Sequence, residues 1–183
     1  MATSKPTIST SFLYETLEET LDIKPLGAKL HIGIPKETAF QENRIALTPE
    51  AVGVLVSNGN EVSIEHLAGE GSHYSDADYS EAGARIVFDR HEIYKCPILV
   101  KSAPIVSEDL PLLQLNQIII SPIHYSALQQ GDIQKMMEKK ITALSFENFK
   151  DASGTYPIVR SMSEIAGSAV MLIAAQYLSS FNK

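Results

Sequence analysis

Short runs rich in Ile and Val alternate with helix-like segments from Lys29 to the end of the chain, and this alternation limits the fold more than any other feature. The strand-like runs are KLHIGI, EVSIEHL, RIVF, PILVKS, QIIIS and ITALSF. Helical patterns lie among them, one opened by Thr48 as a cap with Pro49 in the first turn, and one expected from about Ser163 to Phe181. Strands that alternate with helices form right-handed βαβ crossovers. The pattern therefore predicts an α/β fold, Rossmann-like or flavodoxin-like, with a mainly parallel sheet and helices on both faces.

Residues 1–28 differ from the rest, because they are polar and rich in Ser and Thr. They contain one amphipathic helical pattern, SFLYETLEETL, which ends before Pro25 and Gly27. We therefore predict an N-terminal extension over residues 1–28 and one domain over residues 29–183.

Composition excludes several classes of partner. The 22 acidic side chains outnumber the 15 basic ones, and the formal charge of −7 disfavours nucleic acid and anionic membranes as partners. The N-terminus has no apolar signal region, and the apolar run AVMLIAAQYL is shorter than the about 20 residues that cross a bilayer. We therefore expect a cytoplasmic protein without membrane insertion.

Three residues with reactive side chains have simple structural interpretations. The single Cys96 cannot form an internal disulfide, and we expect it to be a small core residue. Asp76 and Asp78 follow a serine and favour a helix start over a metal site, because two acids without further ligands bind cations weakly. We predict no metal site.

Polar side chains follow four of the predicted strands. Lys36 and Arg44 follow the first strand, and Lys101, His124 and Glu147 follow later ones. Singly, each could be a solvated loop charge, a helix-start residue or half of an ion pair. Parallel strands bring their carboxyl ends to one edge, where ligands bind. There an arginine fork and an ammonium suit a carboxylate, and a histidine can protonate a neighbouring carbonyl oxygen, which indicates a small 2-oxo or 2-amino acid as ligand.

Several motifs carry a resemblance to a known family. IGIPKE, ENRIALTP, LAGEGSHYSDADYSEAGA, IHYSA and MSEIAG resemble the N-terminal half of alanine dehydrogenase and of the nicotinamide nucleotide transhydrogenase alpha subunit, from about Lys29 to Phe181. The resemblance implies that Arg44 binds the substrate carboxylate and that His124 serves in substrate binding and catalysis. It also implies that Met162 and Ser163 lie beside the nicotinamide of NAD. Since the transhydrogenase pattern lacks a histidine at this point, His124 favours alanine dehydrogenase.

The family lysine has two candidate positions. Alanine dehydrogenases read V-K-E-P, whereas this chain reads VKSAP, with one more residue between lysine and proline. Counted back from Pro104, the lysine position falls on Ser102, and one residue of slip reverses the face of a strand. A bulge at Ser102 would restore Lys101 to substrate binding and catalysis. Both registers stay open, and KSAP is closer to the transhydrogenase pattern.

The cofactor motif is not found in the chain. Gly69 and Gly71 form a G-x-G, but Tyr74 stands where a dinucleotide-binding loop has its third glycine, so we expect a tight turn at the rim of the site. In the family, the NAD-binding domain follows the helix that begins at MSEIAG, and we predict that it is absent after residue 183. Two explanations are open: a fragment of a longer protein, or a natural half-protein.

The resemblance implies a reaction and its alternatives. Joined to an NAD-binding domain, the chain would convert L-alanine, NAD and water to pyruvate, ammonium and NADH, and alone it would be inactive. The alternatives are the corresponding part of a transhydrogenase, or a non-catalytic module that binds a small carboxylate. The family also implies a homo-oligomer.

Overall fold

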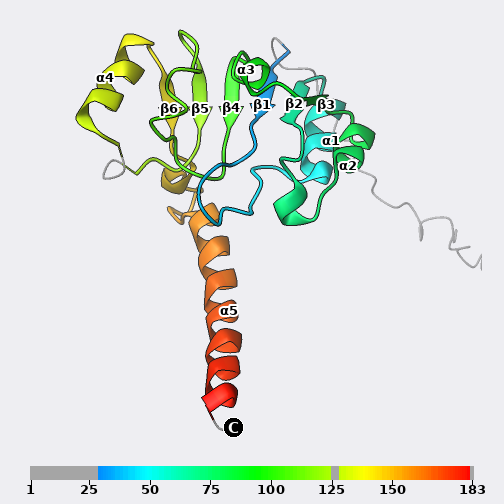
Figure 1. Cartoon of the computed structure of the whole chain (residues 1–183), viewed down its shortest axis with the longest axis vertical. Coiled ribbons are helices and arrows are strands. Elements are labelled where there is room, and N and C mark those ends of the chain that lie inside the picture. Colours follow the sequence, from blue (N-terminus) through cyan, green and yellow to red (C-terminus); the bar gives the residue numbers. More distant parts are fainter. Residues whose placement is uncertain (1–28, 125–127, 182–183) are drawn as a thin grey trace, which may run out of the picture.

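The sheet is the centre of the fold. A computed structural model describes residues 29–124 and 128–181. Six parallel strands form one sheet in the order β3-β2-β1-β4-β5-β6 (Figure 1). The strands are β1 (His31–Ile34), β2 (Glu61–Glu65), β3 (Arg85–Val87), β4 (Ile98–Val100), β5 (Ile118–Ile120) and β6 (Thr142–Leu144). This is the Rossmann order of a doubly wound sheet, and the predicted α/β class is confirmed.

Helices connect the strands, and their ends follow local capping rules. They are α1 (Pro49–Ser57), α2 (Asp76–Glu81), α3 (Arg90–Ile93), α4 (Gln130–Glu138) and α5 (Pro157–Phe181), with the 3-10 turns η1 (Glu70–Ser72) and η2 (Phe146–Asn148). The Thr48 hydroxyl accepts a hydrogen bond from the Ala51 N–H at 3.3 Å, as expected for the cap of α1. Ser75 and Asp78 form a capping box at the start of α2, so the prediction of a helix start there is confirmed.

The two faces of the sheet carry separate cores. Register pairs Gly33 with Leu99, so Leu99 lies on the opposite face from Ile34. The core on the Ile34 face packs α1 and α2 against the sheet and contains Ile34, Val52, Val62, Ile64, Tyr79 and Ala84. The core on the Leu99 face contains Val87, Ile93, Tyr94, Cys96, Leu99, Ile105, Leu110, Leu113 and Ile119. Cys96 is buried there, as predicted, and burial raises the pKa of its thiol.

The last helix begins earlier than the sequence indicated. α5 starts at Pro157, so the expected start near Ser163 is wrong. Proline suits a first helical turn, and that signal outweighs the serine. Ser163 lies inside the helix, where its hydroxyl donates to the Val159 carbonyl oxygen at 2.8 Å, the usual bond of an interior serine.

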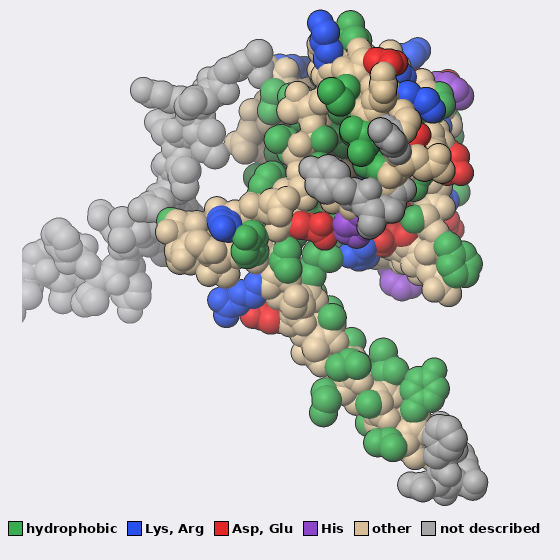
Figure 2. Space-filling view, turned by 90° about the vertical axis from the view of Figure 1, so that its left-hand side faces the viewer, with side chains coloured by type: hydrophobic (Ala, Val, Ile, Leu, Met, Phe, Trp, Pro, Cys, Tyr) green, Lys and Arg blue, Asp and Glu red, His purple; other side chains and the backbone are tan. Residues whose placement is uncertain are grey.

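α5 extends away from the sheet (Figure 1), and apolar side chains cover it on several sides (Figure 2). Ile165, Leu172 and Leu178 are each about 70% exposed. Its Pro157–Ser179 part contains an 18-residue window with a mean hydropathy of 1.4, and it is long and apolar enough to cross a membrane by length and composition alone. The apolar run AVMLIAAQYL covers only part of this length, because Gly167 and Ser168 interrupt the apolar sequence on the side toward Pro157. Absence of membrane insertion therefore stays a prediction, and the predicted extension over residues 1–28 lies outside the described residues.

Candidate functional site

The loops after β1, β4 and β6 meet at the carboxyl edge of the sheet, beside the point where the strand order reverses between β1 and β4. In doubly wound sheets this switch point is where ligands bind. A cavity of about 480 Å³ opens there. Its polar wall contains Arg44, Lys101 and Ser102, and Met162 of α5 also lines it. The rest of the lining is apolar: Ile32, Ile45, Ala46, Leu47, Leu55, Val100, Ile120, Phe146, Phe149 and Ile158.

Arg44 is held in place by Glu42. Its Nε and Nη2 donate to the two carboxylate oxygens at 2.8 and 2.6 Å, and its backbone N–H donates to Oε1 at 2.9 Å. The Arg44 side chain is 57% exposed, against 12% for Glu42. The hydrogen bonds from Arg44 hold the pKa of Glu42 below its usual value, and Glu42 raises the pKa of Arg44. A guanidinium has five N–H donors, so this pair leaves donors for a ligand carboxylate.

Lys101 lies beneath the edge, among acids. Its side chain is 1% exposed, and Nζ lies 3.2 Å from Glu37 Oε2 and 3.2 Å from Asp109 Oδ2. Asp109 also accepts hydrogen bonds from the Tyr94 hydroxyl at 2.6 Å and from Arg90 at 3.1 Å. Burial alone would raise the pKa of Asp109, but Lys101 and the hydrogen bond from Tyr94 outweigh it and hold that pKa below its usual value. The lysine thus belongs to a buried network, while it also lines the cavity.

Ser102 lies next to it, and Glu37 fixes this segment. Glu37 Oε1 accepts hydrogen bonds from the N–H groups of Ser102 at 2.6 Å and Ala103 at 3.1 Å. The Lys101 N–H donates to the Ile120 carbonyl oxygen at 3.0 Å, so the ladder between β4 and β5 continues through this residue. Both candidate lysine positions, Lys101 and Ser102, therefore border the cavity, and only Lys101 carries an ammonium.

His124 follows β5, and its partner is Glu147. Nε2 of His124 lies 3.6 Å from Glu147 Oε2, with the two side chains 53% and 34% exposed. His124 lines a separate small recess with Ile105 and Ser121, and is not among the residues that line the Arg44 cavity. The charge of Glu147 also contributes to the raised pKa of Arg44, which places the two in one electrostatic field.

The structure thus brings Arg44, Lys101 and Met162 to one cavity, while His124 and Ser163 are not in its lining. Sequence reasoning did not single out the carboxylates that hold the cations, Glu37 and Asp109 at Lys101 and Glu42 at Arg44. Glu42 had a local signal, because it stands two residues before the arginine. Asp109 had none, because its partners Lys101, Tyr94 and Arg90 lie eight or more residues away along the chain.

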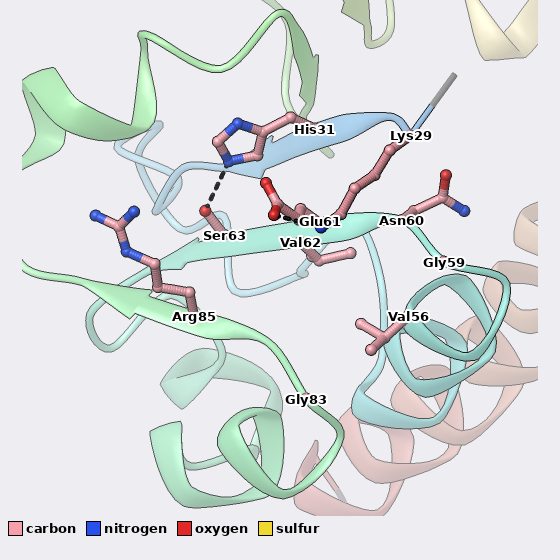
Figure 3. A pocket seen from close by; sticks show the side chains of 10 residues that line it. All are labelled: Lys29, His31, Val56, Gly59, Asn60, Glu61, Val62, Ser63, Gly83 and Arg85. Carbon is pink, nitrogen blue, oxygen red and sulfur yellow. Dashed lines mark hydrogen bonds and ion pairs between the residues drawn. The ribbon is translucent and has the colours of Figure 1, made fainter. Parts of the chain in front are cut away.

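A second hollow, of about 400 Å³, lies at the amino ends of β1, β2 and β3 (Figure 3). Each of its basic side chains has a partner. Lys29 pairs with Glu61 at 2.6 Å, His31 Nε2 lies 3.1 Å from Ser63 Oγ, and Arg85 pairs with Glu92. These groups are thus engaged, as Arg44 and Lys101 are at the carboxyl edge. The carboxyl edge is the better anion site because it lies at the switch point of the sheet, where ligands bind in doubly wound folds. Within residues 29–124 and 128–181, no group of three or more His, Cys, Asp or Glu could hold a metal ion.

Comparisons with known proteins give a consistent picture. Residues 33–166 match the family model described as alanine dehydrogenase/PNT, N-terminal domain. An alanine dehydrogenase of Staphylococcus epidermidis is 33% identical over 153 residues, which is 84% of this chain and 41% of that protein. An alanine dehydrogenase of Staphylococcus saprophyticus is also 33% identical, over 82% of this chain and 40% of its own length.

Solved structures agree with the sequence matches. An L-alanine dehydrogenase superposes with a TM-score of 0.71 and 32% identity, over 75% of this chain and 38% of that one. A transhydrogenase from Sinorhizobium meliloti superposes with a TM-score of 0.58 and 25% identity, over 64% of this chain and 35% of that one. The chain therefore spans about 41% of the length of the Staphylococcus epidermidis relative.

Proposed function

The chain belongs to the alanine dehydrogenase/PNT N-terminal domain family, and on that premise we propose that it is the substrate-binding part of an NAD-dependent alanine dehydrogenase. The reaction would convert L-alanine, NAD and water to pyruvate, ammonium and NADH. One observation carries the proposal: Arg44, Lys101 and Met162, which come from three separate segments, line one cavity at the switch point of the sheet. The chain would work in the cytoplasm, as a homo-oligomer.

Arg44 is assigned to the substrate carboxylate. Glu42 fixes the guanidinium, and the donors that Glu42 does not use can form charge-assisted hydrogen bonds to a carboxylate. Lys101 is assigned to the carboxylate or the neighbouring carbonyl oxygen. An ammonium has three donors, and the two acids beside it leave one for the substrate.

His124 is assigned to the proton at the carbonyl oxygen. Its ion-pair partner Glu147 would orient the imidazole. The apolar lining of the cavity lowers the local dielectric, so each of these charges acts more strongly than it would in water.

When bound, NAD accepts the hydride that leaves the alpha carbon. We assign the dinucleotide mainly to a further domain, with Met162 and Ser163 beside the nicotinamide. Met162 fits this role, because its side chain is partly exposed at the cavity wall and offers an apolar surface to a flat ring. The Ser163 hydroxyl already donates to Val159, so it could only accept a hydrogen bond from the cofactor.

The test has two levels. Titration of the 183-residue chain with pyruvate, followed by NMR, should give binding that Arg44→Ala removes and Arg160→Ala preserves, since Arg160 is an exposed arginine of α5 paired with Glu164. In the complete natural polypeptide, NADH oxidation should require pyruvate and ammonium, and Arg44→Ala should abolish it. Near-normal activity of that variant would remove the assignment.

A transhydrogenase region is the second candidate. It is favoured by the KSAP sequence, which places Ser102 on the cavity, and by the superposition on the Sinorhizobium meliloti transhydrogenase. A transhydrogenase has no 2-oxo-acid or 2-amino-acid substrate. Pyruvate-dependent NADH oxidation therefore supports the first candidate, and hydride exchange between two nicotinamide nucleotides without pyruvate supports the second.

A further inference from the structure

The loop that contains Gly69, Gly71 and Ser72 has no part in the proposed chemistry so far. It forms the 3-10 turn η1 after β2, and Gly71 lines a polar recess of about 220 Å³ together with Glu42, Asn43 and Arg44. The G-x-G pattern therefore lies against the segment that carries the arginine.

The loop lies directly against Asn43, the residue between Glu42 and Arg44. The Ser72 hydroxyl donates to the Asn43 carbonyl oxygen at 2.7 Å. A Cβ at Gly71 would lie 2.9 Å from both the Cα and the carbonyl oxygen of Asn43. Both atoms are backbone, so any side chain at this position would displace the Asn43 segment.

The loop itself is firmly anchored. The Asp76 carboxylate accepts a hydrogen bond from the Leu67 N–H at 3.0 Å, and the capping box of Ser75 and Asp78 ties the end of the loop to α2. Tyr79 of α2 is fully buried, and its hydroxyl donates to the Leu47 carbonyl oxygen at 2.9 Å. The segment from 42 to 47 is thus supported by α2 at Leu47 and by the η1 loop at Asn43.

We propose that Gly71 and Ser72 are positioning residues for Arg44: they fix the Asn43 backbone, and through it the Glu42–Arg44 pair, in the orientation that receives a carboxylate. This rests on the proposed function of Arg44. The loop and the ENR sequence are separated by more than twenty residues along the chain, and the fold brings them into contact. Gly71 has no positive φ, so its backbone conformation does not require a glycine. The close approach of the Asn43 backbone requires it.

Pyruvate titration of the 183-residue chain tests this. Gly71→Ala should weaken binding about 10- to 100-fold, because a displacement of a binding group by a fraction of an ångström to 1 Å costs this much. Ser72→Ala should weaken it about three- to tenfold through the loss of one hydrogen bond, and Ser72→Thr, which keeps the hydroxyl, should restore most of the affinity.

Two glycine variants are matched controls. Gly131→Ala in α4 meets nothing within 4 Å and should leave binding unchanged. Gly33→Ala meets Cys96 Cβ and the Ile93 carbonyl oxygen at 2.9 Å, on the opposite face from Ile34, so it should lower stability without a specific loss of affinity. If Gly71→Ala and Gly33→Ala lose affinity only in proportion to their lost stability, the positioning role is overturned.

A second readout separates this inference from the proposed function. The NMR signal of the Arg44 Nε–H, which donates to Glu42, reports the pair without any ligand. It should move in Gly71→Ala and stay in place in Gly131→Ala. If the wild-type chain binds no pyruvate but the signal moves as expected, the proposed function fails and the positioning role stands. If the signal does not move, the positioning role fails.

Discussion

Two sets of ion pairs lie near one another at the carboxyl edge of the sheet and differ in their exposure to water. The buried set joins Lys101, Asp109, Arg90 and Tyr94, with Lys101 and Asp109 no more than 2% exposed at the side chain. The rim set is the Glu42–Arg44 pair, in which the arginine side chain is 57% exposed. The residue types are similar, but the first set holds the strand ends together and the second presents a cation to solvent.

The difference shows that charge alone does not identify a binding residue. A charge removed from water must be paired, and breaking such a pair is costly, whereas an exposed pair contributes little to stability and remains able to exchange partners. The Arg44 guanidinium is thus available to a ligand, whereas the Lys101 ammonium is available only in part. Four measurements test this contrast.

The largest effect is expected for Asp109→Asn. The change removes a buried anion that Lys101 and Arg90 share, and should lower the free energy of unfolding by about 3 kcal/mol, since Glu37 still pairs with Lys101 and Glu65 with Arg90. Urea unfolding measures it. Asp89→Asn is the control, because Asp89 is an exposed N-cap of α3 and asparagine caps equally well. Equal small losses in both variants would show that the buried network does not carry stability.

Acid should act on the same network, with a smaller effect because protonated Asp109 keeps its hydrogen-bond geometry. Its pKa in the folded state lies below the ordinary value of 3.8, so its contribution is present above pH 3.8 and is lost as pH falls through the folded-state pKa. The stability difference between wild type and Asp109→Asn should therefore narrow as urea curves are recorded from pH 7 to below 3.8. A constant difference across this range would rule out Asp109 as the titrating group.

Glu42→Gln should change stability much less, by about 0.2–1 kcal/mol, because the arginine of the pair is exposed. The same variant should change the Arg44 Nε–H signal and weaken pyruvate binding, since glutamine offers only one acceptor oxygen. A stability loss as large as that of Asp109→Asn would erase the distinction between the rim and the buried set.

The smallest effect is expected for Arg160→Ala on α5. Its partner Glu164 lies one turn away at 2.9 Å, and both side chains are more than 60% exposed. Such i,i+4 pairs contribute about 0.3–0.5 kcal/mol, so the unfolding midpoint should hardly move. A larger loss would mean that α5 has a packing role that its exposure does not suggest.

Most of the fold could be predicted from the sequence. The alternation of Ile- and Val-rich runs with helical patterns indicated six strands, and each is found, because the period of apolar residues is a local property of the chain. Thr48 with Pro49 and Ser75 with Asp78 marked the starts of α1 and α2 for the same reason. The start of α5 was misplaced at Ser163, since two helix-start signals competed and the earlier one, Pro157, prevailed.

The candidate site was predicted only in part. Sequence reasoning brought Arg44 and Lys101 to one edge, because parallel strands present their carboxyl ends together. It did not predict that the arginine is exposed and the lysine is buried. It also did not predict that His124 pairs with Glu147 at 3.6 Å and lies outside the lining of the Arg44 cavity.

The sequence by itself determined the strands, the caps, the family motifs and the edge at which the charges collect. The tertiary structure alone decided which charges are buried, which carboxylates hold them, and that Gly71 lies against Asn43. The physical reason is distance along the chain. Periodicity and capping depend on neighbours within a few residues, whereas desolvation and pairing depend on segments such as 37, 101 and 109 that meet only when the sheet has formed.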